Sequence, residues 1–200
     1  MRFAVNPLQF YAGLDGMLDF SAGPPYHDVL RACQAAGFRA VQAELGPAVG
    51  AMAYAAMLRA PRLAAAPAYF SAPLVSEDQH AKIAADFRAA VAMSRDLGLD
   101  RIVVADNVTR DRFLTAGRHT DNPAPQAALA SAATVLERLG RIGQEAGVAA
   151  SLHPHVGSHI ESPLEIASIL AETSPELVQL CPDTGHLAWG GCDDVIGFLR

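Results

Sequence analysis

Short apolar runs alternate with longer amphipathic stretches along the chain, and this alternation restricts the folds that it can adopt. A short apolar run suits a strand that is buried on both faces, whereas apolar residues recurring once per turn suit a helix packed on a sheet. Repeated strand and helix units build a parallel sheet with helical crossovers. We expect strands at six places: Arg2–Val5, Ala40–Ala43, Leu63–Ala66, Arg101–Ala105, Val148–Leu152 and Leu177–Leu180.

Helices are expected between these strands. Ser76-Glu77-Asp78-Gln79 has the form of a capping box, and apolar residues at helical spacing follow it until Gly98. Ser162-Pro163-Leu164-Glu165 has the same form, with proline at the first helical position. A long amphipathic helix is predicted to end near Gly147, and Val108–Gln126 has the polar and helix-breaking residues of a long loop.

The composition indicates one globular domain and favours a small molecule as its partner. The chain has 200 residues, of which 51% are hydrophobic, and its net charge is −6 without a stripe of Lys and Arg. A nucleic acid is therefore not the expected partner. A membrane is not expected either, because there is no long uncharged apolar run. Cys33, Cys181 and Cys192 lack the spacing of a disulfide framework or a thiolate zinc site, so we expect a cytoplasmic protein.

Polar side chains gather where the predicted strands end. In a (β/α) barrel these ends converge on one mouth, so residues far apart in the sequence can share a pocket. A doubly wound dinucleotide-binding sheet would instead have a glycine-rich phosphate loop after its first strand, and residues 6–13 contain no such loop. The polar residues at or after the six strand ends are Asn6, Gln9, Glu44, Tyr69, Asp106, Asn107, His153, His155, Asp183 and His186.

The last of these residues have the chemistry of a metal site. Neutral imidazole suits Zn, Mn, Fe, Co and Ni, and an aspartate supplies negative charge. Side chains alternate along a strand, so His153 and His155 should face the same way, and Gly185 permits a turn that returns His186 to the pocket. A metal with open positions polarises a carbonyl and favours proton abstraction beside it. We therefore predict a metal-assisted active site.

Two acidic residues keep two interpretations each. Glu44 follows apolar residues at the second predicted strand, and it either faces the substrate or pairs with a charged residue at a neighbouring strand end. Glu161 precedes the predicted helix at Ser162, and it either contacts the substrate or belongs to the acidic first turn of that helix.

Three motifs resemble the sugar isomerase/epimerase-like TIM barrels of the xylose-isomerase type, a group that includes inosose dehydratase, ketose 3-epimerases, hydroxypyruvate isomerase and the apurinic endonuclease IV branch. Asp183-Thr184-Gly185-His186-Leu187 is similar to the DTGH motif of strand six. The segment from His153 to Glu161, HPHVGSHIE, resembles the HPHxGTxxE segment of inosose dehydratase-like members. Glu44-Leu45-Gly46 is similar to the ELG at their second strand. The resemblance covers essentially the whole chain.

The resemblance implies a TIM (β/α) barrel with about six of its eight βα units in this chain, so residues 1–200 are expected to form a single barrel domain that is C-terminally incomplete. In the family a divalent metal is held by a strand-five residue, the Asp of DTGH, a strand-seven His and a strand-eight Glu. His153 and Asp183 match the first two positions, although the strand-five ligand is usually Glu. Without the last two strands, full activity is not expected.

The implied activity is metal-dependent isomerisation or epimerisation of a sugar, sugar phosphate or cyclic polyol by proton transfer next to a carbonyl through an enediolate. An inosose dehydratase-type lyase is the alternative, and a catalytically inactive sugar-binding barrel is an alternative of another class. Phosphodiester hydrolysis is less favoured because the chain is acidic. The resemblance also favours a homo-oligomer. The expected roles are catalytic for Glu44, His155 and His186, substrate-binding for Asn6, Asn107 and Glu161, and metal-binding for His153 and Asp183, with Mn, Co, Zn, Fe or Mg as the metal.

Overall fold

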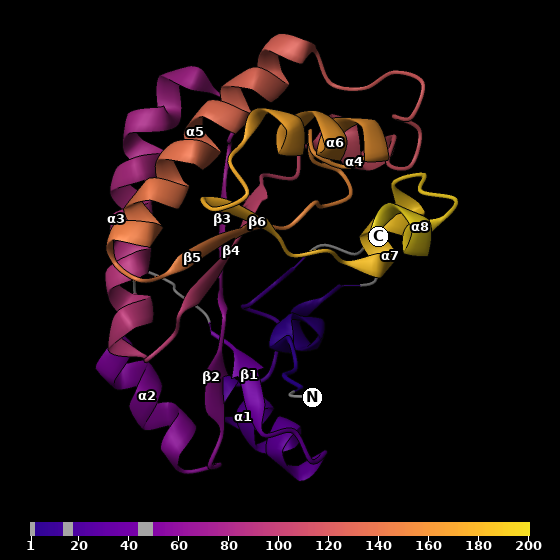
Figure 1. The fold of residues 1–200 in the computed structure, drawn as a ribbon. Helices are drawn as coiled ribbons and strands as arrows, with labels where there is room; N and C mark the ends of the chain where they lie inside the picture. Colours follow the sequence, from indigo (N-terminus) through magenta and orange to yellow (C-terminus); the bar gives the residue numbers. More distant parts are fainter. Residues whose placement is uncertain (1–2, 14–17, 44–49) are drawn as a thin grey trace.

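Parallel strands alternate with helices in a partial α/β barrel (Figure 1). The computed structural model describes residues 3–13, 18–43 and 50–200, so the predicted role of Glu44 lies outside the described residues. Two sheets are present in these ranges, one of two strands and one of four strands in sequence order, and every pairing is parallel. The strands are β1 (Ala40–Gln42), β2 (Ala64–Ala66), β3 (Ala68–Ala72), β4 (Arg101–Asp106), β5 (Ala149–Leu152) and β6 (Val178–Leu180).

Two long helices, α3 (His80–Asp96) and α5 (Gln126–Glu145), lie side by side on one face of the four-stranded sheet (Figure 1).

No helix in the described ranges is both long enough and apolar enough to cross a membrane. The other helical elements are η1 (Pro7–Tyr11), α1 (Tyr26–Ala35), α2 (Ala51–Arg59), η2 (Glu77–Gln79), α4 (Arg110–Leu114), α6 (Pro163–Glu172), α7 (Thr184–Trp189) and α8 (Val195–Phe198).

Five of the six predicted strands are confirmed, the first is reduced to a single bridge, and one strand was not predicted. The expected strand Leu63–Ala66 is confirmed as β2, and a further strand that was not expected, β3, follows it after Pro67. Pro67 has no N–H to donate to a ladder and separates the two strands, of which β2 pairs with β1 and β3 with β4. Of the predicted strand Arg2–Val5, Val5 makes an isolated bridge to Val41, and Arg2 lies outside the described residues.

One of the two predicted capping boxes forms. The Ser162 side chain accepts from the N–H of Glu165, and the Glu165 carboxylate accepts from the N–H of Ser162, so α6 begins as predicted. The Ser76 prediction is wrong, because a turn of 3-10 helix follows Ser76 and its side chain makes no capping bond. The predicted loop Val108–Gln126 contains the short helix α4, which the Thr109 side chain caps.

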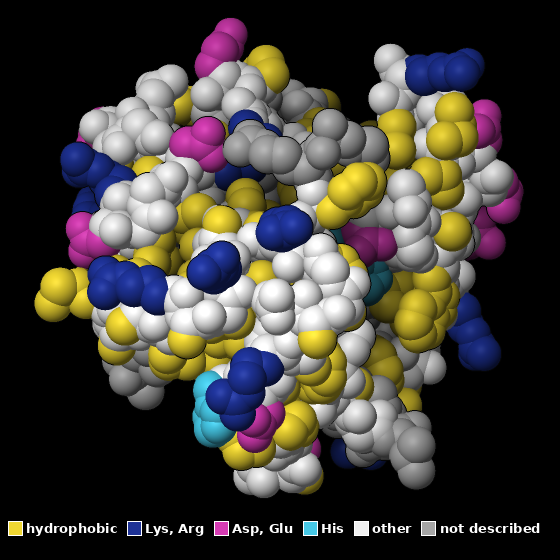
Figure 2. All heavy atoms as spheres, turned by 90° about the horizontal axis from the view of Figure 1, so that it is seen from below, with side chains coloured by type: hydrophobic (Ala, Val, Ile, Leu, Met, Phe, Trp, Pro, Cys, Tyr) yellow, Lys and Arg dark blue, Asp and Glu magenta, His cyan; other side chains and the backbone are white. Residues whose placement is uncertain are grey.

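The two faces of the four-stranded sheet have different partners. Val104 and Leu152 point into a core that also contains Phe87 of α3 and Leu136 of α5, and all four side chains are fully buried. The alternate residues face the opposite side, where Val103 and Tyr69 line a pocket. On the molecular face in Figure 2, Lys and Arg side chains lie in separate groups rather than in a continuous stripe.

Helix α5 lies so close to the start of β6 that one of its positions has no room for a side chain. A Cβ at Gly140 would lie 2.5 Å from the carbonyl oxygen of Leu177, and this oxygen belongs to the backbone. In a free helix, alanine in place of glycine favours folding by about 1 kcal/mol. Here the methyl group would push α5 away from β6, and such overpacking costs roughly 1–3 kcal/mol.

We predict that Gly140→Ala lowers the free energy of unfolding by about 1–2 kcal/mol, measured by urea denaturation, because overpacking outweighs helix propensity. Thr134→Ala is the matched control, because Thr134 is an exposed residue of the same helix. It should change the free energy of unfolding by less than about 0.5 kcal/mol. A Gly140→Ala protein as stable as the wild type would contradict the close packing.

Candidate metal and active site

A pocket of about 800 Å³ opens at the carboxyl ends of the strands, on the sheet face opposite α3 and α5. Its wall combines residues that are distant in the sequence, as expected for the mouth of a (β/α) barrel. The polar residues of the wall are Asn6, Gln9, Gln42, Tyr69, Ser71, Asp106, His153, His155, Asp183 and His186.

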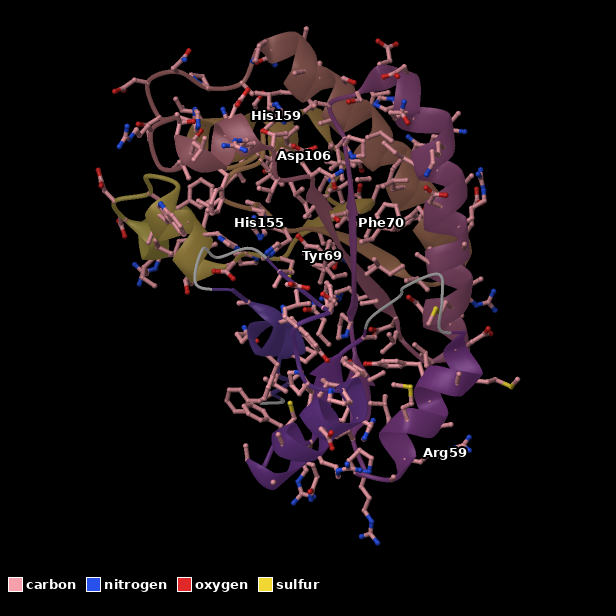
Figure 3. All side chains as sticks on the ribbon, turned by 180° about the vertical axis from the view of Figure 1, so that it is seen from behind. Arg59, Tyr69, Phe70, Asp106, His155 and His159 are labelled. Atoms are coloured by element: carbon pink, nitrogen blue, oxygen red, sulfur yellow. The ribbon has the colours of Figure 1, made fainter. Side chains whose placement is uncertain are left out.

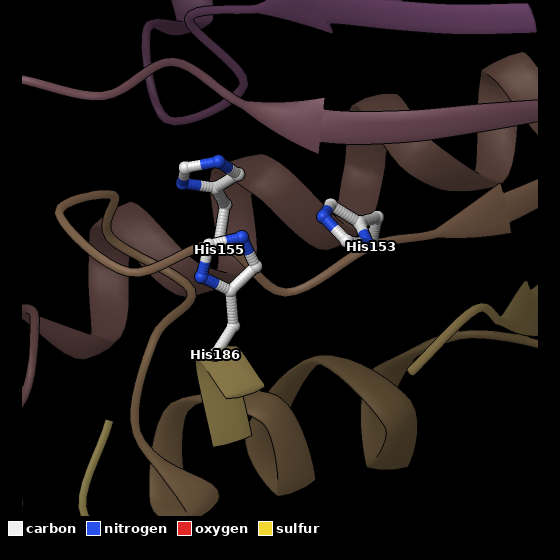
Figure 4. A group of neighbouring side chains, drawn as sticks. All are labelled: His153, His155 and His186. Atoms are coloured by element: carbon white, nitrogen blue, oxygen red, sulfur yellow. The ribbon is translucent and has the colours of Figure 1, made fainter. Parts of the chain in front are cut away.

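Three histidines converge in this pocket (Figure 4). One ring nitrogen from each of His153, His155 and His186 lies within 4.8 Å of those of the other two. The ring centroids are 5.7 Å apart for His153 and His155, 5.4 Å for His153 and His186, and 4.0 Å for His155 and His186. The three side chains could therefore bind one ion together.

The backbone explains how the sequence brings these rings together. The N–H of His153 donates to the carbonyl of Val104 at 2.7 Å, so the β5 ladder continues to His153. His155 is two residues further on, at a position that returns its side chain to the pocket. His186 reaches the same place from the first turn of α7, which begins directly after Asp183.

Backbone carbonyls select the tautomer of two of the rings. Nδ1 of His153 lies 3.3 Å from the carbonyl oxygen of Cys181, and Nδ1 of His155 lies 2.8 Å from that of Val156. A carbonyl oxygen can only accept, so a neutral ring makes this bond only with its hydrogen on Nδ1. Each neutral ring then keeps its lone pair on Nε2, which is the arrangement of a histidine that binds a metal.

The electrostatics of the pocket keep at least two rings neutral. Burial lowers the pKa of His186 to about 4, with a further lowering by His155 that outweighs the opposite effect of Asp183. Burial also lowers the pKa of His153, although the Cys181 carbonyl acts in the opposite direction. Neutral imidazole is the form that binds a metal, so the donor set fits a divalent cation at neutral pH.

Asp183 lies beside the three rings but has a second task. Its Oδ1 accepts from the N–H of Gly185 at 2.8 Å and from the N–H of His186 at 2.9 Å, which caps α7. Burial raises the pKa of Asp183, but these bonds and the nearby His186 ring lower it by more. The carboxylate therefore stays ionised at neutral pH. It is not one of the three residues whose ligand atoms meet within 4.8 Å.

The other predicted site residues differ in position. Asn6 lines the pocket, while its Oδ1 accepts from the N–H of Leu8 and caps η1. Asn107 is not part of the described pocket wall, and its N–H extends the β3–β4 ladder by donating to Ala72. Glu161 is also absent from that wall. It is only 1% exposed, because its carboxylate is turned into the protein and accepts from backbone N–H groups.

Two polar residues of the wall, Gln42 and Ser71, were not expected from the sequence. Ser71 and Tyr69 lie on the pocket side of β3, whereas Phe70 between them packs against the core (Figure 3). The alternation in Tyr69-Phe70-Ser71 is the signal that could have found Ser71. Tyr69 packs edge-on against His153, with ring centroids 5.8 Å apart. Burial, followed by the charge of Asp106, raises the pKa of Tyr69 to about 12, so its phenol is a neutral hydrogen-bond donor.

Known proteins resemble this chain over different lengths. Inosose dehydratase from Bacillus cereus (strain AH820) is 41% identical over 56 residues, which are 28% of this chain and 19% of that protein. A Mycobacterium smegmatis xylose isomerase-like TIM barrel protein in complex with magnesium superposes with a TM-score of 0.65 at 18% identity, covering 92% of this chain and 65% of that one. The structure of IOLI protein with a zinc atom has a TM-score of 0.65 at 15% identity, with coverages of 96% and 66%.

The two structural likenesses establish a shared fold, and this chain spans about two thirds of the length of those proteins. The family model described as xylose isomerase-like TIM barrel matches residues 30–198, which is most of the chain. The parallel strands, the helical crossovers and the pocket at the carboxyl strand ends agree with that match. This chain therefore belongs to the xylose isomerase-like TIM barrel family.

Proposed function

We propose that this chain holds a divalent metal and takes part in moving a proton next to a carbonyl group of a sugar, sugar phosphate or cyclic polyol. The observation on which the proposal rests is the convergence of three histidine nitrogens within 4.8 Å in one pocket. The inosose dehydratase relatives and the magnesium and zinc bound by structural neighbours support it. The matched segment covers 19% of the inosose dehydratase relative, so the complete reaction is proposed for this chain and not transferred from that relative.

His153, His155 and His186 would hold the metal, with the ionised Asp183 beside them to balance its charge. When bound, such a metal supplies a Lewis acid that polarises a substrate carbonyl and lowers the barrier to proton removal from the next carbon. Three imidazoles favour Zn, Co, Fe or Mn over Mg, which prefers oxygen ligands.

The remaining polar residues of the wall would recognise the substrate. The neutral phenol of Tyr69 and the side chains of Gln42, Ser71 and Asn6 can exchange hydrogen bonds with several hydroxyl groups, as a polyol requires. Glu44, outside the described residues, stays our candidate for the group that exchanges the proton through an enediolate. Asn107 stays a candidate for contact with a longer substrate. We also propose a homo-oligomer, to be tested by light scattering.

An inosose dehydratase-type reaction is the second candidate, and the 41% identity to the Bacillus cereus enzyme favours it. Dehydration begins with the same proton abstraction, and a hydroxyl on the next carbon then leaves as water. The two reactions can be distinguished by their products, because isomers and epimers keep the mass of the substrate and a dehydrated product does not. A sugar-binding barrel without activity would instead retain its ligand after removal of metal.

The proposed reaction predicts exchange of a substrate proton with solvent. Incubated in deuterated water with ketoses or inososes, the metal-loaded protein should incorporate one deuterium next to the carbonyl, detected by mass spectrometry of recovered substrate and product. Chelation should abolish the exchange. Unchanged substrate affinity after chelation, together with no exchange before it, would support the sugar-binding alternative.

The metal site predicts stoichiometric binding that depends on the three histidines. Plasma mass spectrometry and calorimetry should find about one Zn²⁺ or Co²⁺ per chain, and His155→Ala or His186→Ala should weaken binding about 100-fold or more, since a ligand is lost outright. His27→Ala is the matched control, because His27 is an exposed histidine of α1. Equal affinity in all four proteins would exclude this site.

The depressed pKa of His186 predicts a pH dependence of stability in the metal-free protein. Its pKa is about 4 in the folded chain and 6.5 ordinarily, so the unfolded state binds more protons between these values. Stability should therefore fall as pH drops from about 6.5 towards 4, with His153 acting in the same direction. In urea denaturation with chelator, His186→Gln should lose less stability than the wild type over this interval. Parallel curves would contradict the shift.

A further inference from the structure

One peptide group, between Val156 and Gly157, is hydrogen-bonded at both ends to side chains. Its carbonyl oxygen lies 2.8 Å from Nδ1 of His155, and its N–H donates to Oε2 of Glu161 at 2.6 Å. The chain of contacts thus runs from a carboxylate, through one peptide, to an imidazole in the pocket.

The Glu161 carboxylate is directed onto backbone groups. Its other oxygen, Oε1, accepts from the N–H of Gly117 at 2.7 Å, and the residue is 1% exposed. The nearby guanidinium of Arg112 instead donates to Glu165 and to the carbonyl of Ser158. Among the described residues, the Glu161 carboxylate therefore accepts hydrogen bonds from two peptide N–H groups. Its negative charge polarises these two N–H groups.

The orientation of the peptide is fixed by packing as well. Gly157 has a φ of +82°, which favours glycine, and a Cβ there would lie 3.1 Å from Val108 and 3.2 Å from Phe113. The segment after β4 thus lies close to Gly157, and Glu161 accepts from the N–H of the same peptide. The Val156 carbonyl is in consequence aimed at His155 before any ion arrives.

From this geometry we propose that Glu161 is a positioning residue that acts on His155 through the 156–157 peptide. A carboxylate that polarises the N–H makes the carbonyl at the other end a stronger acceptor. The carbonyl then holds the hydrogen on Nδ1 and leaves Nε2 of His155 as the metal-binding atom. Histidine ligands commonly donate their outer N–H directly to a carboxylate, and here a peptide group is inserted between the two.

The positioning role differs from the substrate contact expected of Glu161. It deepens the proposed function, and it rests on that function wherever His155 acts as a metal ligand. The proposal about the tautomer concerns the metal-free protein, so it can be tested separately. In ¹⁵N-histidine-labelled protein with chelator, two-bond nitrogen–proton correlations report which ring nitrogen carries the hydrogen. His155→Gln identifies the His155 signals.

We expect His155 of the wild type to be the Nδ1–H tautomer. Glu161→Gln removes the charge and places an amide N–H₂ against one of the two N–H donors, so a mixture of tautomers should appear. Zn²⁺ or Co²⁺ affinity should fall about 10-fold or more. Ser158→Ala is the matched control, because Ser158 is buried in the same loop and its Oγ accepts from Ile160. It should keep the tautomer and change affinity by less than about 2-fold.

The outcomes separate the two proposals. A wild-type His155 in the Nε2–H form overturns the positioning role even if Glu161→Gln fails to fold. Unchanged tautomer and affinity in a folded Glu161→Gln protein overturn it as well, and leave the metal site standing. A tautomer change in Glu161→Gln, combined with a wild type that binds no metal, supports the positioning role and rejects the proposed function. Equal losses in Ser158→Ala and Glu161→Gln would reduce Glu161 to a general stabiliser of the loop.

Discussion

The alternation of side chains across the four-stranded sheet is the constraint on which the pocket depends. Val104 and Leu152 must face α3 and α5, because that core contains most of the buried hydrophobic residues of the described chain. A shift by one residue would turn these side chains out of the core, so the register is fixed by burial. Tyr69 and His153 then have to face the other side. The pocket is in this sense a consequence of the core.

Buried acidic groups hold the loops that complete the site. Burial raises the pKa of Glu165, but bonds from the N–H groups of Ser162, Ala124 and Glu161 and from Arg112 lower it by more, so the group stays ionised. Asp106 accepts from the N–H of Leu74 and from both the N–H and ring of His159, which it faces in Figure 3. A buried charge is tolerated only with such partners. These carboxylates join the ends of β3, β4 and β5 to the loops beyond them.

Local signals were sufficient where a segment determines its own structure. The Ser162 cap, the end of α5 and five strands were predictable because they rest on periodicity and on residue patterns within one segment. Ser76 has the same local pattern, but a 3-10 turn follows it and its side chain makes no capping bond. Pro67 divides one apolar run between two sheets, and the choice of a partner strand is a long-range contact.

By itself, the sequence determined the class of fold, the chemical types of the candidate site residues and the edge of the sheet at which most of them gather, since these follow from residue type and spacing. Only the tertiary structure decided which side-chain atoms already accept hydrogen bonds from the backbone. In the folded chain, Oδ1 of Asp183 accepts from N–H groups at the start of α7, and both carboxylate oxygens of Glu161 accept from backbone N–H groups. Three histidine nitrogens come together in the pocket. Hydrogen-bond partners of this kind come from segments distant in the chain, and a linear pattern contains no information about their direction.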